Sequence, residues 1–166
     1  ATTAALTYAT IERNQVYSSP RVFWEDVVEK RPQNPRAHEQ LGQILMTAGE
    51  REAGWQHILR AHELDPKNIS IENRIAQLYM EEGNVEAARP FIERPVAFFD
   101  SGGDQVAVNY FRPKRAHTYC LYGALLTTLG EPQRALPYFE KGLRANPRFF
   151  EGRINHAMAL AALQRH

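Results

Sequence analysis

The sequence has very few of the residues that cross-link a fold or hold a structural metal, since Cys120 is its only cysteine. One cysteine cannot form an intramolecular disulfide or a cysteine-rich zinc module, and it leaves the redox compartment open. Long apolar runs are also missing, because no stretch approaches the roughly 18 consecutive apolar residues of a membrane span. We therefore expect no direct membrane insertion by this segment.

The sequence also lacks an excess of charge of either sign. Its 166 residues include 20 Lys and Arg against 19 Asp and Glu, which gives a formal net charge of +1. Binding to nucleic-acid phosphates depends on clustered Lys and Arg, so we expect no nucleic-acid partner. With 43% hydrophobic residues, the composition is that of an ordinary soluble globular domain.

The residues that are present repeat with a period of 34 positions. Apolar and small residues return to the same slots in four successive stretches, with one insertion between the second and the third. Spacings of three and four residues between these slots are typical of amphipathic helices. The aligned slots hold His38, Leu41, Gly42 and Leu45, then Glu72, Ile75, Ala76 and Tyr79, then Tyr119, Tyr122, Gly123 and Leu126, and finally Arg153, His156, Ala157 and Leu160.

This pattern resembles the tetratricopeptide repeat, whose 34-residue signature is W-x2-L-G-x2-Y, then A-x3-F, then P. The resemblance implies an all-α fold, an α-solenoid of antiparallel helix pairs with about 3.5 repeats and an N-terminal helical segment. The sequence departs from the signature in two ways: the large aromatic of the first slot occurs only as Tyr119, and Pro95 replaces a small residue. The expected single domain has N-terminal helices with a degenerate repeat at 1–34, repeats at 35–68 and 69–102, an insertion at 103–115, a repeat at 116–149, and the first helix of a fourth repeat at 150–166.

Glycine and proline predict where the helices begin, end and touch. Gly49, Gly83 and Gly130 fall between the two helices of their repeats, where a left-handed residue typically ends a helix. Gly42 and Gly54 occupy slots where small residues allow two helix backbones to approach closely. Proline predicts a helix start at four places, Ser19-Pro20, Asn34-Pro35, Glu131-Pro132 and Asn146-Pro147.

Residues 84–115 break the pattern, because Pro90 and Pro95 both lie inside the second helix expected for that repeat. A proline in a helix interior costs about 3 kcal/mol, so we expect a kink or a late helix start. Residues 100–103 then predict a loop, which aromatic residues follow. Two interpretations stay open: the segment closes over the concave surface and helps to hold a ligand, or its aromatic residues pack on neighbouring helices.

In a stacked array of this kind, the outward residues of each first helix line a concave face that binds peptides or partner proteins. The resemblance therefore implies a protein–protein interaction scaffold. Transferring the outward slots by register predicts the binding residues, which are Arg36, Glu39, Gln40, Gln43 and Met46, then Asn73, Arg74, Gln77 and Met80, then His117, Cys120, Leu121, Ala124 and Thr127, and finally Ile154 and Met158.

The predicted groove is polar in its first half and nearly apolar in its second. Family members that hold acidic C-termini use Lys and Asn at groove slots, whereas the corresponding slots here carry Glu39, Gln43, Asn73 and Gln77. A carboxylate clamp is therefore disfavoured. The apolar half suits an extended or amphipathic apolar segment. The alternative is self-association through the apolar C-terminal helix, or a further helix that covers it.

Candidate residues for catalysis are few. His117 and Cys120 share a helix face, a spacing compatible with a Cys–His nucleophile pair or with half of a metal site. No third partner is evident in the sequence, and the glycines mark helix ends and contact points instead of a phosphate-binding loop. We expect no enzyme activity, no metal and no cofactor.

The N-terminal stretch carries a second resemblance. Three short motifs resemble the junction where a membrane-embedded glycosyltransferase-like region passes into a tetratricopeptide array. They are Arg13-Asn14-x-x-Tyr17, Phe23-Trp24-x-Asp26 and Pro32-x-Asn34-x-Arg36-Ala37. This resemblance implies an alternative function, the soluble extracytoplasmic accessory region of a membrane-anchored bacterial protein. Otherwise the motif aromatics are helix-core residues and the chain is a cytoplasmic scaffold.

Overall fold

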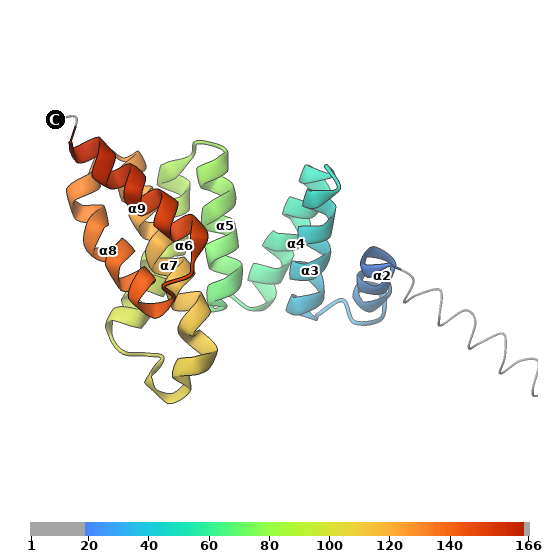
Figure 1. Cartoon of the computed structure of the whole chain (residues 1–166). Coiled ribbons are helices and arrows are strands. Elements are labelled where there is room, and N and C mark those ends of the chain that lie inside the picture. Colours follow the sequence, from blue (N-terminus) through green and yellow to red (C-terminus); the bar gives the residue numbers. More distant parts are fainter. Residues whose placement is uncertain (1–18, 165–166) are drawn as a thin grey trace, which may run out of the picture. The chain divides into compact units, whose positions relative to one another are not determined.

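The computed structural model describes residues 19–164, apart from the side chains of Val106 and Val108. All regular structure in this part of the chain is helical (Figure 1), which confirms the predicted all-α fold. Arg13, Asn14 and Tyr17, which carry part of the second resemblance, lie outside the described residues. The elements are α2 (Pro20–Lys30), α3 (Pro35–Thr47), α4 (Arg51–Leu64), α5 (Ile69–Glu81), α6 (Val85–Asp100), the 3-10 helix η1 (Gln105–Ala107), α7 (Val108–Thr128), α8 (Pro132–Ala145) and α9 (Phe150–Leu163).

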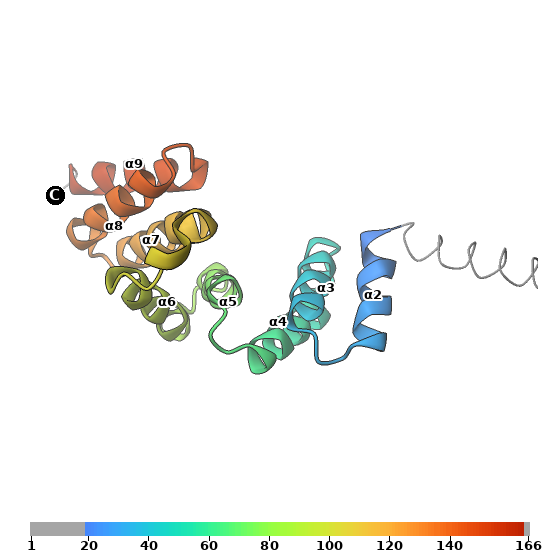
Figure 2. The same cartoon turned by 90° about the horizontal axis from the view of Figure 1, so that it is seen from below.

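Packing contacts divide the chain into two compact units, the N-terminal unit (residues 1–71) and the C-terminal unit (residues 72–166). In the N-terminal unit, α3 packs against α2 and α4. In the C-terminal unit, α7 packs against α6, α8 and α9, and α8 also contacts α9, as Figures 1 and 2 both show. The helices follow the predicted alternation, with α3, α5, α7 and α9 as the first helices of successive repeats.

The glycines between paired helices adopt the predicted left-handed conformation. Gly49, Gly83 and Gly130 have φ values of 87°, 76° and 79°. Each turn is closed by a backbone hydrogen bond between residues five positions apart. In the first turn, the N–H of Glu50 donates to the carbonyl of Leu45 at 2.9 Å. The same bond joins Asn84 to Tyr79 at 2.8 Å and Glu131 to Leu126 at 2.9 Å. A residue with a Cβ would be strained at these three positions.

Three of the four predicted proline starts are confirmed, since α2, α3 and α8 begin at Pro20, Pro35 and Pro132. The side chain of Asn34 caps α3, because its Oδ1 accepts a hydrogen bond from the backbone N–H of Arg36 at 3.1 Å. Proline at the first helical position loses no intrahelical bond, since that N–H has no partner in a helix.

The fourth predicted start, at Asn146-Pro147, is wrong. The backbone N–H of Asn146 still donates to the carbonyl of Gly142 at 2.9 Å, so Asn146 ends α8. Its Oδ1 accepts a bond from the N–H of Arg148 at 3.2 Å and forms a turn, and α9 begins three residues after Pro147. The same Asn-Pro pair can therefore cap a helix or close one, depending on whether the chain arrives as a helix.

Gly42 and Gly54 bring α3 and α4 into backbone contact, as predicted. A Cβ on Gly42 would lie 2.8 Å from the carbonyl oxygen of Gly54. A Cβ on Gly54 would lie 2.8 Å from the carbonyl oxygen of Gly42 and 2.5 Å from Cγ of Met46. Neither position has room for a side chain, so the separation of the two helices depends on both glycines.

The predicted late start of the second helix in residues 84–115 is wrong. Asn84 caps α6 by accepting a bond from the N–H of Ala87 at 3.2 Å, and the helix runs from Val85 through Pro90 and Pro95 to Asp100. Each proline removes one backbone bond. Burial of apolar side chains along one face of α6 offsets this cost, because four of them are removed from water. They are Ala88, Ile92, Val96 and Phe99.

Most of residues 103–115 extend α7 at its N-terminal end. After η1, α7 starts at Val108 and continues through Pro113 without interruption. Phe111 packs against Phe98 and Phe99, with ring centroids 5.6 and 6.1 Å apart. These aromatics pack between α6 and α7, in agreement with the second of the two interpretations.

The two described units each contain a buried polar contact between helices. In the C-terminal unit, Asn73 of α5 donates to Oγ1 of Thr118 of α7 at 2.8 Å, and both side chains are buried. In the N-terminal unit, Nδ1 of His38 lies 2.9 Å from Nδ1 of His57. His38 Nε2 bonds the carbonyl of Pro32, which can only accept, so in the neutral ring of His38 the proton lies on Nε2 and Nδ1 accepts from His57.

We expect Gly54→Val to lower the free energy of unfolding by about 2 kcal/mol or more, because the added carbons overlap a backbone oxygen that cannot move alone. Ala53→Val, on the exposed side of the same helix, is the matched control and should cost no more than about 0.7 kcal/mol from helix propensity. Chemical denaturation measures both. Equal costs for the two variants would show that the glycine contact is not required.

We also expect stability to fall as the pH drops below 6.5. Burial, with the neighbouring His38 ring, lowers the pKa of His57 from its ordinary value of 6.5, so the unfolded chain binds the proton more readily. The stabilising contribution of neutral His57 is present above pH 6.5 and is lost below it. His57→Gln keeps a donor for His38 and should flatten the dependence of melting temperature on pH. An unchanged pH dependence would contradict this assignment.

Candidate functional site

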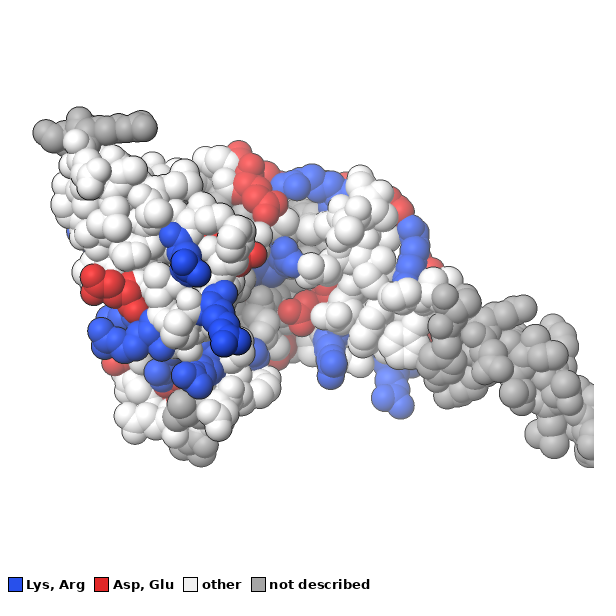
Figure 3. Space-filling model, viewed as in Figure 1, with Lys and Arg blue, Asp and Glu red and all other residues white. Residues whose placement is uncertain are grey.

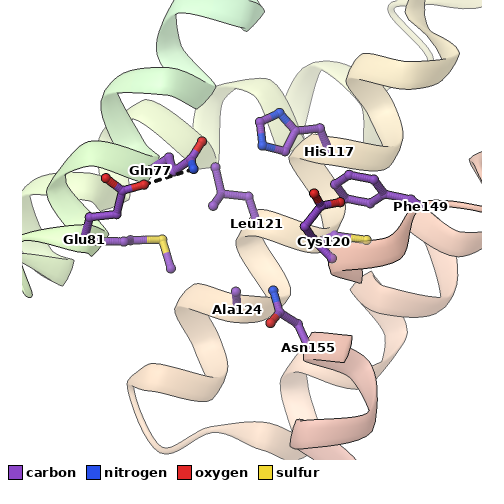
Figure 4. Close-up of a pocket in the computed structure, with 10 residues that line it drawn as sticks. Gln77, Glu81, His117, Cys120, Leu121, Ala124, Phe149 and Asn155 are labelled. Atoms are coloured by element: carbon purple, nitrogen blue, oxygen red, sulfur yellow. Dashed lines mark hydrogen bonds between the residues drawn. The ribbon is translucent and has the colours of Figure 1, made fainter. Parts of the chain in front are cut away.

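A pocket of about 630 Å3 opens on the C-terminal unit between the first helices of three successive repeats (Figure 4). Figure 4 shows Gln77 and Glu81 of α5 on one side of Leu121, with Phe149 and Asn155 on the other. The pocket is therefore built by α5, α7 and the start of α9. Its lining residues are Gln77, Met80, Glu81, His117, Cys120, Leu121, Ala124, Phe149, Glu151 and Asn155.

The pocket walls are mainly apolar, with carboxylates at two sides. Met80, Leu121, Ala124 and Phe149 supply hydrocarbon and aromatic surface. On α5, the side chain of Gln77 donates to Glu81 at 3.0 Å, which holds that carboxylate beside the pocket. Glu151, in the first turn of α9, supplies the second carboxylate.

His117 contributes an uncharged ring to the pocket. Burial, together with the nearby positive charge of Arg74, lowers the pKa of His117 below its ordinary value of 6.5. Its ring lies edge-on to that of Phe149, with centroids 6.0 Å apart. At neutral pH the histidine therefore acts as part of the aromatic wall.

Cys120 is a packing residue and not a nucleophile. Cβ atoms on Gly142 of α8 and Gly152 of α9 would lie 2.5 and 2.6 Å from its Sγ, so the sulfur fills the space that the two glycines leave. Burial raises the pKa of the Cys120 thiol to about 12, and a thiol that stays protonated at neutral pH is unreactive. Within residues 19–164, no group of three or more His, Cys, Asp or Glu residues is placed to hold a metal ion.

Six of the predicted binding residues come together at this pocket: Gln77, Met80, His117, Cys120, Leu121 and Ala124. Five others of the C-terminal unit do not line it, and one of them, Asn73, is buried. The charge of Arg74 acts on His117, and Thr127 donates its hydroxyl to the carbonyl of Gly123 at 2.9 Å. Ile154 and Met158 are exposed on α9, outside the pocket.

Asn73 requires a correction, because the fold buries the side chain that was expected to face a ligand. Asn73 is only 1% exposed and is bonded to Thr118, so it joins two helices. Met46, also predicted to bind, is half-buried, and its Cγ lies against Gly54 of α4.

The other predicted residues of α3 belong to the N-terminal unit, and the pocket is built without them. Arg36 and Gln43 are exposed, whereas Glu39 and Gln40 are half-buried.

Four lining residues are outside the set named above. Two of them, Glu81 and Asn155, are outward residues that the same transfer by register predicts. Glu151 occupies in the fourth repeat the slot that His117 occupies in the third, so register could have found it as well. Glu81 follows Met80 on the groove side of α5. Phe149 precedes α9, and no feature of the repeat pattern indicates its position.

The outer side of α9 is an uncovered apolar surface. Phe150 is 68% exposed and Met158 is 62% exposed, and Ile154 and Leu160 are exposed as well. Phe150 and Ile154 occupy the slots that Ala116 and Cys120 hold in α7, where these two residues lie against Gly142 of α8. This part of the α9 surface is thus the one that a second helix covers in the preceding repeat.

No helix within residues 19–164 has both the length and the hydrophobicity that crossing a bilayer requires. The resemblance of the N-terminal motifs to a glycosyltransferase junction is not tested by this observation and stays a prediction. The coding sequence upstream of residue 1 would test it directly, because that resemblance requires long apolar segments there.

A sequence profile of the tetratricopeptide repeat matches residues 116–149, which are the predicted third repeat and include most of α7 and all of α8. No curated protein matches the chain in sequence. The evidence for the remaining repeats is therefore structural.

Several solved structures share the fold. The structure of PilF from Pseudomonas aeruginosa has a TM-score of 0.70 and 20% identity, and the match covers 97% of this chain and 67% of that one. The first tetratricopeptide-repeat domain of Spaghetti (RPAP3), bound to the HSP90 peptide SRMEEVD, has a TM-score of 0.63 and 18% identity, over 80% of this chain and 94% of that one. MamA has a TM-score of 0.57 and 16% identity, over 94% and 83%. Residues 116–149 thus match a tetratricopeptide repeat, and the chain shares the helical-repeat fold of these solved structures.

Proposed function

We propose that the pocket between α5, α7 and α9 holds an extended segment of a partner protein. Tetratricopeptide-repeat proteins are generally interaction scaffolds and generally not enzymes, which supports binding as the activity. The observation that carries the proposal is the pocket itself, about 630 Å3 in volume and formed by the first helices of three successive repeats. That volume is within the usual range for ligand sites.

An apolar side chain of the partner anchors the segment. Met80, Leu121 and Phe149 surround the space, and neutral His117 adds a further aromatic wall. Burying one Leu, Phe or Met side chain there contributes roughly 1.5 to 3 kcal/mol.

The charges around the pocket select basic residues beside the anchor. Glu81 and Glu151 approach it from α5 and α9, so two carboxylates line it against the positive charge of Arg74, which acts on His117 from outside the lining. The partner segment therefore carries Lys or Arg next to its apolar anchor. An acidic segment such as SRMEEVD, which the Spaghetti domain binds, would face two like charges in this pocket.

Fluorescence anisotropy with two synthetic peptides tests this proposal. One peptide places Lys on both sides of a central Phe, and the other places Glu there. We expect the Lys peptide to bind more tightly, Leu121→Ala to weaken it about tenfold and Glu151→Gln about fivefold. Glu140→Gln removes the same charge from the exposed side of α8 and should change nothing. Unchanged affinity in folded Leu121→Ala would exclude the pocket as the binding site.

A second candidate function is self-association through α9, which the exposed Phe150 and Met158 favour. Met158→Glu should abolish concentration-dependent association in sedimentation velocity, whereas Gln133→Glu on the exposed side of α8 should leave it unchanged. A wild-type chain that sediments as a monomer at high micromolar concentration would exclude self-association.

A further inference from the structure

The C-terminal unit has a second hollow, between the N-terminal half of α7 and the last turns of α8. Its volume is about 280 Å3, and it shares no lining residue with the peptide pocket. Figure 3 shows Lys and Arg side chains gathered on the lower part of this unit, where Figure 1 places the start of α7 and the end of α8. The hollow is lined by Arg112, Arg115, Tyr119, Lys141, Arg144 and Ala145.

Two of the four cations at this hollow have carboxylate partners. Arg115 forms an ion pair with Asp104, whose side chain is fully buried, and Lys141 pairs with Asp100 at 2.7 Å. Within residues 19–164, neither Arg112 nor Arg144 has a carboxylate partner. The hollow therefore carries about two positive charges that the described residues do not balance.

Three of these cations, Arg112, Arg115 and Lys141, are held in place by other groups of the protein. Nε of Arg112 donates to the carbonyl of Ala145 at 3.0 Å, which leaves both terminal nitrogens of the guanidinium for another acceptor. Lys141 lies over the rings of Tyr119 and Tyr138, 5.2 and 5.0 Å from their centroids. Preorganised Arg side chains bind tetrahedral anions well, because the planar fork matches two oxygens at once.

We propose that this hollow binds the phosphoryl group of a small phosphate monoester. Such a group carries a charge of about −1.5 to −2 at neutral pH, which matches the two unbalanced cations. A volume of about 280 Å3 lies at the small end of ligand sites, so it admits a phosphoryl group with a short organic substituent. The phosphoryl group belongs either to a soluble metabolite or to a lipid headgroup, and the experiment below distinguishes these two sources.

Isothermal titration of the chain with glycerol phosphate, at low ionic strength where screening is weakest, tests the site. We expect saturable binding that Arg144→Gln weakens about tenfold and that Arg112→Gln with Arg144→Gln abolishes. In parallel, cosedimentation with vesicles containing phosphatidic acid tests the lipid source. Binding of glycerol phosphate assigns a soluble ligand, and saturable binding of vesicles alone assigns a headgroup.

Arg134→Gln is the matched control, because it removes one Arg from the other end of α8, where Arg134 pairs with Glu131. It should bind both probes as the wild type does, and all variants should keep their melting temperatures. The proposal fails if neither probe binds, or if the double variant binds as tightly as Arg134→Gln. Because the peptide pocket is separate, loss of the phosphate site leaves peptide binding unchanged.

Discussion

Where glycine takes the place of a side chain, two helices of this protein approach until backbone atoms touch. The Gly42–Gly54 contact sets the spacing of α3 and α4. A Cβ added to either glycine would lie 2.8 Å from the carbonyl oxygen of the other. In the third repeat, the sulfur of Cys120 fills a different space, which Gly142 of α8 and Gly152 of α9 leave. The lone cysteine thus joins three helices by packing, and a larger side chain at any of these positions would push the helices apart.

The candidate peptide pocket follows from that spacing. Cys120 positions α9 against α7, and the buried Asn73–Thr118 bond ties α5 to α7. The gap left between the three helices has apolar walls and carboxylates at two sides. The extension of α7 before residue 116 builds the second hollow, because it brings Arg112 and Arg115 next to the end of α8. One long helix therefore contributes to an acidic pocket and to a basic hollow.

Local sequence rules worked where the backbone alone decides the outcome, and failed where packing competes with them. Gly49 has the predicted positive φ because only glycine adopts it without strain. Pro90 and Pro95 failed to interrupt α6, because burial of Ile92 and Phe99 outweighs two lost backbone bonds. At the pocket, register correctly predicted Leu121 and Ala124. It wrongly predicted that Asn73 faces the groove, because Asn73 is buried and hydrogen-bonded to Thr118, and a partner 45 positions away in the sequence cannot be recognised from a repeat pattern.

The sequence by itself determined the helical repeat and the turns between helices, because these depend on periodicity and on the conformational range of glycine and proline. Only the tertiary structure decided which outward residues meet at one pocket, that Phe149 belongs to it, and that four cations from two helices share one hollow. Those outcomes depend on distances between side chains on different helices. No pattern along the chain encodes such distances, because they arise only when the helices pack.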